Sequence, residues 1–197
     1  MAIAIEFSHI RKSYGDTVII PDLNLQIEKG EFVTIVGSSG CGKTTALKMI
    51  NGLYEPTSGD IFVNGENIKN IDMIRLRRSI GYAIQGSVLF PNMTVEENIS
   101  YVPSLLNKND KEKTKKAVDK WMEVIGLDPC MKDRYPSELS GGQQQRVGIA
   151  RALAASPDIL LMDEPFGAVD AITREQLQNE MKSLHKKTGI TILFVTH

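Results

Sequence analysis

An apolar run that leads directly into a glycine-rich loop constrains this chain more than any other feature. The run is Glu31–Val36, and the loop Gly37-Ser-Ser-Gly-Cys-Gly-Lys-Thr44 fits the phosphate-binding pattern Gly-x-x-x-x-Gly-Lys-Thr. Its glycines let the backbone bend so that successive N–H groups converge on an anion. A helix is predicted to begin near Gly42, and its positive N-terminal end adds to this attraction. A chance glycine-rich turn seldom stands between a strand and a helix, so the loop predicts a nucleoside triphosphate site.

Residues of this loop have distinct predicted roles. Lys43 is predicted to contact the β- and γ-phosphates, and the Thr44 hydroxyl is predicted to hold Mg²⁺. The other residues of the segment that are predicted to contact the nucleotide are Gly37, Ser38, Ser39, Gly40, Cys41, Gly42 and Thr45.

Two adjacent carboxylates end the run Ile159-Leu-Leu-Met-Asp-Glu-Pro165. Four consecutive apolar residues are typical of a strand buried on both faces of a parallel sheet, and such sheets bind ligands at their carboxyl ends. Asp163 is predicted to hold the Mg²⁺ shell. Because side chains alternate along a strand, Glu164 is expected to point elsewhere and to act as general base for an attacking water. The alternative is an ordinary acidic pair at a solvated strand end.

A second glycine-containing marker, Leu139-Ser-Gly-Gly-Gln143, precedes another predicted helix. Ser140 and Gln143 fit a capping box, and apolar residues recur at helical spacing at Val147, Ala150 and Ala154. A helix that opens with Ser-Gly-Gly is a second anion-binding end, whereas an ordinary cap explains the serine but not the two glycines. Either one chain binds two nucleotides, or two chains share each nucleotide.

Strand and helix patterns predict an α/β fold in one domain, residues 1–197, with two kinds of sheet. Strand-like runs at 31–36, 80–85, 159–162 and 190–196 favour a parallel core. Shorter segments predict an antiparallel layer: Ala2–Phe7, Thr17–Ile20, Leu23–Ile27 and Ile61–Val63. The core is expected over 1–87 and 157–197. Residues 88–156 read as an inserted helical subdomain, with a capped helix start at Thr94 and Glu97.

Composition sets limits on function. The 197 residues suffice for one large core, and a net charge of −1 leaves no basic footprint for nucleic acid. The isolated Cys41 and Cys130 form no metal or redox motif and suit a reducing cytosol. No apolar run approaches the length of a membrane span, and no signal peptide is visible.

The lysines of 108–116 are expected on a helix whose apolar positions are Ala117, Trp121 and Val124. His9 and His185 are expected at the surface.

The ordered set of motifs resembles the ATP-binding subunits of ABC transporters across the whole chain. The resemblance implies a RecA-like P-loop NTPase core, with ATP and Mg²⁺ as cofactors and two subunits that sandwich two ATP molecules head to tail. It implies that Tyr14 stacks on adenine and that Gln85 contacts Mg²⁺ or water and links to the membrane subunit. Ser140, Gly141, Gly142 and Gln143 would close over the γ-phosphate bound by the partner chain. Asp170 and the catalytic His197 complete the set.

Finer likeness points to importers of glycine betaine, carnitine and choline, on the phrases Leu89–Thr94, Val102–Leu106 and Asp163–Asp170. Gly86 and Val169 depart from the usual glutamine and leucine. Permease subunits in the membrane and, indirectly, a solute-binding protein are then the partners, and the chain is expected at the cytoplasmic face of the membrane. Family members continue beyond the position of His197, so a truncated chain is expected.

Rival functions remain at this point. A soluble P-loop kinase or GTPase would share 37–44 but would not explain Leu139–Gln143 or His197. A non-transport ABC ATPase would share every motif, although many of those fuse two such units or insert long coiled coils. Import of another small solute, such as an amino acid, an ion or a metal, is equally compatible with the motifs, because the ATPase subunit does not touch the cargo.

Overall fold

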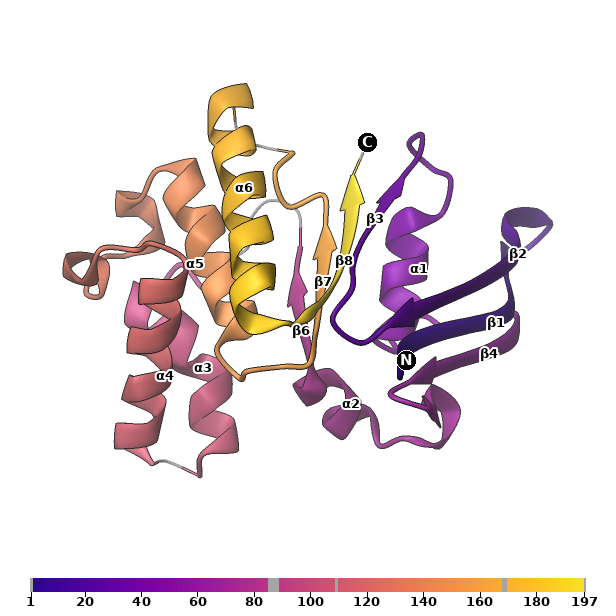
Figure 1. The fold of residues 1–197 in the computed structure, drawn as a ribbon, viewed down its shortest axis with the longest axis horizontal. Coiled ribbons are helices and arrows are strands. Elements are labelled where there is room, and N and C mark those ends of the chain that lie inside the picture. The colour runs from indigo at the N-terminus through magenta and orange to yellow at the C-terminus, as the bar shows by residue number, and fades with distance from the viewer. Residues whose placement is uncertain (1, 85–88, 109, 168–169, 197) are drawn as a thin grey trace.

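Two β-sheets with helices between and beside them form the fold of this protein (Figure 1). The structure is a computed structural model and describes residues 2–84, 89–108, 110–167 and 170–196. One sheet is antiparallel and the other is parallel, as the sequence predicts. The α/β fold class is therefore confirmed.

The antiparallel sheet has the order β2-β1-β4-β5. Its strands are β1 (Ile3–Tyr14), β2 (Thr17–Glu28), β4 (Ser58–Val63) and β5 (Glu66–Asn67). The predicted short segments were wrong in extent, because β1 and β2 each run unbroken for 12 residues. Register shifts between Phe7 and Ile10 and further along the β1–β2 pair absorb the polar stretch around His9 without ending the strand. Tyr14 is the last residue of β1.

The parallel sheet has the order β3-β8-β7-β6. Its strands are β3 (Phe32–Val36), β6 (Ile80–Ala83), β7 (Ile159–Asp163) and β8 (Thr191–Thr196). Every residue of β7 is buried, which confirms the interpretation of the apolar run. Because Val36 pairs with Thr196 and Asp163 with Val195, the carboxyl ends of β3, β7 and β8 meet at one edge of the sheet.

One core lies between the two sheets and a second lies on the far face of the parallel sheet. Helix α1 (Lys43–Ile50) buries Leu47 and Ile50 between the sheets, against residues of β1 and of β7. Helices α5 (Gly141–Leu153) and α6 (Ala171–Thr188) cover the opposite face, as Figure 1 shows. A short helix, α2 (Met73–Ser79), precedes β6. The parallel sheet therefore separates α1 from α5.

The segment between β6 and β7 is helical in the residues that the structure describes. It contains α3 (Val95–Leu106), α4 (Lys111–Val124) and α5, with 3-10 turns at Pro129–Met131 and Pro136–Glu138. Another 3-10 turn, Ile68–Asn70, lies earlier in the chain, before α2. The predicted capping box at Thr94 and Glu97 is confirmed. In α4 Trp121 is buried as expected, but its neighbours in the core are Thr114, Val118 and Met122, while Ala117 and Val124 are only partly buried. None of the helices in the described segments is long and apolar enough to cross a membrane.

A single glycine determines how closely α5 approaches the parallel sheet. A Cβ atom at Gly81 in β6 would lie 2.5 Å from the carbonyl oxygen of Ala152, near the C-terminal end of α5. Real Cβ atoms do not approach a backbone oxygen so closely, so only glycine permits this contact between strand and helix.

Candidate nucleotide-binding site

The phosphate loop joins β3 to α1 and leaves the helix start without a side-chain cap. Gly40 and Gly42 have φ angles of 81° and 95°, in the left-handed region that glycine adopts without strain. Gly42 is the N-cap of α1, and no side chain there accepts a hydrogen bond from the first turn. In contrast, Thr94 and Ser140 cap α3 and α5 with their side chains. Without a capping side chain, the N–H groups at the start of α1 are available to an anion.

The side chain of Lys43 reaches back to the start of the phosphate loop. Its ammonium group donates to the carbonyl oxygens of Gly37, at 2.6 Å, and Ser38, at 2.9 Å, and the residue is buried. Neutral carbonyls compensate the charge of a buried ammonium poorly. Phosphate oxygens at this place would supply the missing negative charge.

Thr44 and Asp163 form the oxygen pair that the sequence predicts for Mg²⁺. The Thr44 hydroxyl donates to Asp163 Oδ1 at 2.8 Å, across the edge where β7 ends. Mg²⁺ prefers oxygen ligands and is usually bound by one or two protein groups together with substrate phosphates. Within the described ranges no group of three His, Cys, Asp or Glu side chains could hold a metal by itself. The hydroxyl and the carboxylate beside a phosphate loop fit a magnesium–nucleotide complex.

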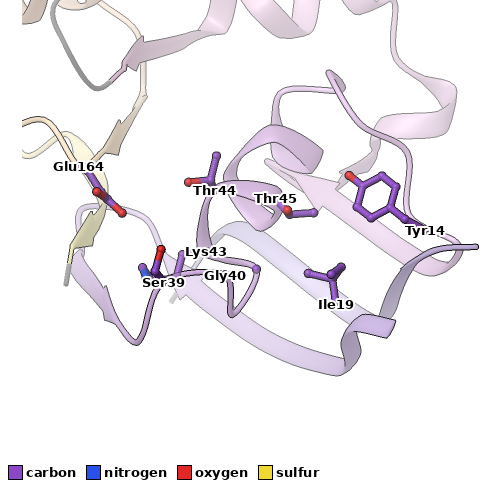
Figure 2. Close-up of a pocket in the computed structure, with 9 residues that line it drawn as sticks. Tyr14, Ile19, Ser39, Gly40, Lys43, Thr44, Thr45 and Glu164 are labelled. Carbon is purple, nitrogen blue, oxygen red and sulfur yellow. The ribbon is translucent and has the colours of Figure 1, made fainter. Parts of the chain in front are cut away.

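The side chains of Glu164 and Asp163 point in different directions because of the backbone conformation of Glu164, and not because side chains alternate along a strand. Strand β7 ends at Asp163, and Glu164 has a φ of 44°, so the expected alternation does not apply. Its N–H donates to the Val195 carbonyl at 3.0 Å, and its own carbonyl accepts from Gly167 at 3.1 Å. These bonds hold a non-glycine residue in the left-handed conformation, which costs about 1–3 kcal/mol. Residues in such strained conformations occur most often at functional sites. The carboxylate is thereby directed into the cavity above the phosphate loop (Figure 2).

One cavity brings together predicted nucleotide ligands from separate elements. Tyr14 and Ile19 line the end formed by the antiparallel sheet, and Glu164 lies at the other end (Figure 2). Between them lie Ser39, Gly40, Gly42, Lys43, Thr44 and Thr45. The exposed Cys41 is part of the same loop. The arrangement provides an aromatic surface, a phosphate loop and a carboxylate in the order that a nucleoside triphosphate and an attacking water require.

Sequence reasoning missed two tyrosines that contact this site. Tyr54 stands edge-on to Tyr14, with ring centroids 6.4 Å apart, and Lys12 lies 4.8 Å from the Tyr14 ring. The Tyr82 hydroxyl donates to Asp163 Oδ2 at 3.4 Å. Burial, together with the charge of Asp163, raises the pKa of Tyr82 above its ordinary value, so the phenol keeps its proton. Neither tyrosine belongs to a motif, and only the strand register could have indicated Tyr82.

Helix α5 starts at the predicted second anion site, away from this cavity. The Ser140 hydroxyl accepts from the Gln143 N–H at 3.3 Å, which confirms the capping box. Ser140 and Gly141 are exposed, and none of Ser140, Gly141, Gly142 and Gln143 lines the cavity of Figure 2. Asp170 is exposed and precedes α6, where its carbonyl accepts from the Arg174 N–H. Gln85 and His197 lie outside the described residues.

The two histidines named as surface residues behave differently. His9 is exposed, as expected, with 79% of its side chain accessible. The prediction for His185 was wrong, because its ring is half-buried on α6, with Nε2 2.8 Å from the Gly30 carbonyl and an edge contact to Phe32. The turn before β3 packs against α6 and covers the ring.

The two-sheet fold, the phosphate loop and the paired carboxylates define a P-loop nucleotide-binding protein. The model of the ABC transporter family matches residues 20–167, and the chain belongs to this family. It is 53% identical over 194 residues to the carnitine transport ATP-binding protein OpuCA of Listeria monocytogenes. It is 50% identical over 193 residues to the glycine betaine uptake system ATP-binding protein YehX of Escherichia coli. These matches cover 98% of the chain, but 49% and 62% of the relatives, so the chain spans about half the length of OpuCA.

Solved structures share the fold. The post-hydrolysis dimer of the ATP-binding cassette MJ0796 bound to ADP and Pi has a TM-score of 0.85 and 34% identity, over 98% of this chain and 88% of that one. The cbiO1 protein of Clostridium perfringens, part of the ABC transporter complex cbiONQ, has a TM-score of 0.91 and 29% identity, over 100% of this chain and 79% of that one.

Proposed function

We propose that this chain binds ATP with Mg²⁺ in the cavity of Figure 2 and hydrolyses it to ADP and phosphate. The observation that carries the proposal is the meeting of three groups at one sheet edge: the loop with Lys43, the Thr44–Asp163 oxygen pair and the strained Glu164. Phosphate binding alone would not require a carboxylate held in a costly backbone conformation. The family and the MJ0796 complex with ADP and Pi support the same reaction.

Each part of the site has a chemical task in this proposal. Tyr14 stacks on the adenine, and the loop N–H groups together with Lys43 bind the β- and γ-phosphates. Mg²⁺ would supply positive charge that offsets the charge of the phosphates, and Thr44 and Asp163 would be the residues that hold it. Glu164 takes a proton from the attacking water. The water oxygen bonds to the γ-phosphorus while the bond between the γ-phosphorus and the ADP oxygen breaks. Gln85 and His197 complete the catalytic set by family likeness.

A second copy of the chain is required to complete the site. The start of α5, the predicted second anion site, belongs to a helix on the far face of the parallel sheet and does not line its own chain's cavity. In a head-to-tail pair, Ser140, Gly141, Gly142 and Gln143 of one copy close over the γ-phosphate in the other, with Asp170 at the interface. The dimeric state of MJ0796 supports this arrangement.

A groove between the core and the helical subdomain fits the contact with permease subunits. We place the boundaries of that subdomain at 88 and 156, with the core over 1–87 and 157–197. The groove is lined by apolar and aromatic residues, among them Ile84, Phe90 and Tyr101, with guanidinium groups at Arg77, Arg78 and Arg151. Ile84, which lines the groove, directly precedes Gln85 in the sequence, so a membrane subunit docked there would contact the chain next to a predicted catalytic residue. In this proposal the chain lies at the cytoplasmic face of the membrane, with a solute-binding protein as an indirect partner.

The transported solute in this proposal is a quaternary-ammonium osmoprotectant. Relatives named for carnitine, choline and glycine betaine transport are 50–53% identical to the chain. Relatives named for Fe(3+) ion or spermidine/putrescine import are 42% and 46% identical. The difference favours the osmoprotectant class over the ion and polyamine classes.

Hydrolysis and transport need separate experiments. The purified chain should release phosphate from ATP only when Mg²⁺ is present, and a chain that binds ATP without hydrolysis would contradict the enzymatic assignment. For transport, the protein would be reconstituted in vesicles together with a permease, if one is encoded beside its gene. Radiolabelled glycine betaine, carnitine, choline and spermidine would then be compared. Uptake of spermidine alone would overturn the solute class while leaving the ATPase assignment intact.

A further inference from the structure

The register of the parallel sheet places Tyr82 and Asp163 on the same face. Tyr82 of β6 pairs with Leu161 of β7, and Asp163 follows Leu161 by two residues. Because strand side chains alternate, residues 161 and 163 project to one side, and Tyr82 projects with them. That side is the one that α1 covers, since Leu161 and Leu47 belong to the core between the sheets, where Tyr82 also packs. A tyrosine is long enough to reach the diagonal neighbour on the next strand.

The two oxygens of the Asp163 carboxylate are held by donors from different elements. Thr44 of α1 donates to Oδ1 at 2.8 Å, and the Tyr82 phenol donates to Oδ2 at 3.4 Å. Asp163 is 7% exposed, so water contributes little to its orientation. With one donor, the carboxylate could rotate about its bond to Cβ. A second donor on the other oxygen, even at 3.4 Å, restricts that rotation and favours one orientation of the carboxylate.

We propose that Tyr82 is a positioning residue that holds the Asp163 carboxylate in the orientation that magnesium–ATP requires. The inference rests on the proposed function of this site and deepens it by naming a residue behind the metal ligand. Groups that orient a metal-binding side chain change metal affinity by about 10–100-fold when they are removed. The long 3.4 Å contact places Tyr82 at the low end of this range.

The test compares ATP affinity with and without the metal on the same protein. Dissociation constants of ATP would be measured by calorimetry in excess Mg²⁺ and in excess EDTA, and their ratio is the Mg²⁺ enhancement. We expect Tyr82→Phe to lower this enhancement by about tenfold and to leave the affinity in EDTA unchanged. The ring remains, so packing between the sheets is preserved. Any loss of folded protein would affect both measurements equally and cancel from the ratio.

A matched control and a second readout separate positioning from packing. Tyr135→Phe removes the hydroxyl of a tyrosine that is 45% exposed in the helical segment, and it should leave the enhancement unchanged. In Tyr82→Phe the Mg²⁺ concentration that gives half-maximal hydrolysis should rise, while the rate at saturating Mg²⁺ returns toward that of the parent.

Three results would overturn the inference. An unchanged Mg²⁺ enhancement in Tyr82→Phe means that the phenol does not act on the metal site. An equal loss of affinity in Mg²⁺ and in EDTA means that Tyr82 only supports packing. Absence of any Mg²⁺ effect in the parent protein would overturn the proposed metal site itself, and the inference with it, whereas the first two results leave the proposed function standing.

Discussion

The hydroxyl of Thr44 donates a 2.8 Å hydrogen bond to the carboxylate of Asp163, although 119 positions of sequence separate the two residues. The bond joins the first turn of α1 to the last residue of β7, and so connects the phosphate loop to the carboxylate edge of the sheet. Substitutions in either motif are therefore expected to affect the same bound nucleotide.

Lys43→Ala should abolish tight ATP binding. The ammonium group provides the positive charge inside the loop, and it also holds the carbonyls of Gly37 and Ser38. Its removal takes away the phosphate contact and loosens the loop at the same time. Calorimetric titration with ATP measures the effect, and the exposed Lys29→Ala serves as the control. Micromolar affinity retained in Lys43→Ala would argue against the phosphate assignment.

Tyr14→Ala should weaken ATP binding by roughly 1–3 kcal/mol, the usual contribution of stacking between a base and an aromatic ring. Tyr14 is 49% exposed, so its loss should not reduce stability. Tyr14→Phe keeps the ring and should bind ATP as the parent does. Inorganic tripolyphosphate, which has no base, should bind both variants equally. A loss of tripolyphosphate affinity in Tyr14→Ala would indicate damage to the loop and not a lost stacking surface.

Glu164→Gln should leave ATP binding intact and slow hydrolysis by roughly 10²–10⁴-fold, the usual contribution of a general base. Glutamine keeps the size of the side chain but cannot accept the proton of the attacking water. Binding by calorimetry and phosphate release by a colorimetric assay measure the two effects separately. Hydrolysis at the parent rate would exclude Glu164 as the base.

The same variant should become dimeric with ATP and remain monomeric with ADP. ATP that persists in the cavity holds the start of α5 from a second copy, and a ligand bound more tightly by one state shifts the population toward that state. Adding Ser140→Arg should abolish the dimer, because it places bulk at the exposed helix start where the partner's nucleotide docks. Size-exclusion chromatography with light scattering gives the mass. A monomer of Glu164→Gln in ATP would contradict the shared site.

Asn98→Ala should destabilise the fold by at least about 1–3 kcal/mol, the cost of one unsatisfied buried polar group. Asn98 is fully buried and donates to the carbonyls of Phe90, Met93 and Thr94, while its own oxygen accepts from the Phe90 N–H. Urea unfolding measures the loss. The exposed Asn70→Ala should change stability by less than about 0.5 kcal/mol. Equal effects of the two substitutions would show that the carbonyls of Phe90, Met93 and Thr94 find other hydrogen-bond donors when Asn98 is lost.

Local signals made most of the site predictable. The strand before the loop, the helix after it and the two capping boxes each depend on residues within a few positions of one another. The buried strand that ends at Asp163 followed from its unbroken apolar run. These patterns reflect backbone hydrogen bonding and side-chain periodicity, which the sequence records directly.

Contacts between distant segments were not predictable in the same way. Tyr54 against Tyr14, Tyr82 against Asp163 and His185 against Gly30 depend on which elements become neighbours. The left-handed backbone at Glu164 depends on its bond to β8, which no local pattern specifies. The length of β1 was missed because a register shift absorbs a polar stretch that reads as a break.

Because Gly81 has no side chain, the C-terminal end of α5 contacts the parallel sheet directly, and a change at this contact would tilt the whole helix. The carbonyl of Ala152 rests against β6 at one end of the helix, and Ser140 caps the other end, 13 helical residues and roughly 20 Å away. A tilt of roughly 10° at the pivot would carry Ser140 by roughly 3 Å, the length of a hydrogen bond. A methyl group added at residue 81 is therefore expected to displace the far end of α5, the end that contacts the second copy in the proposed dimer.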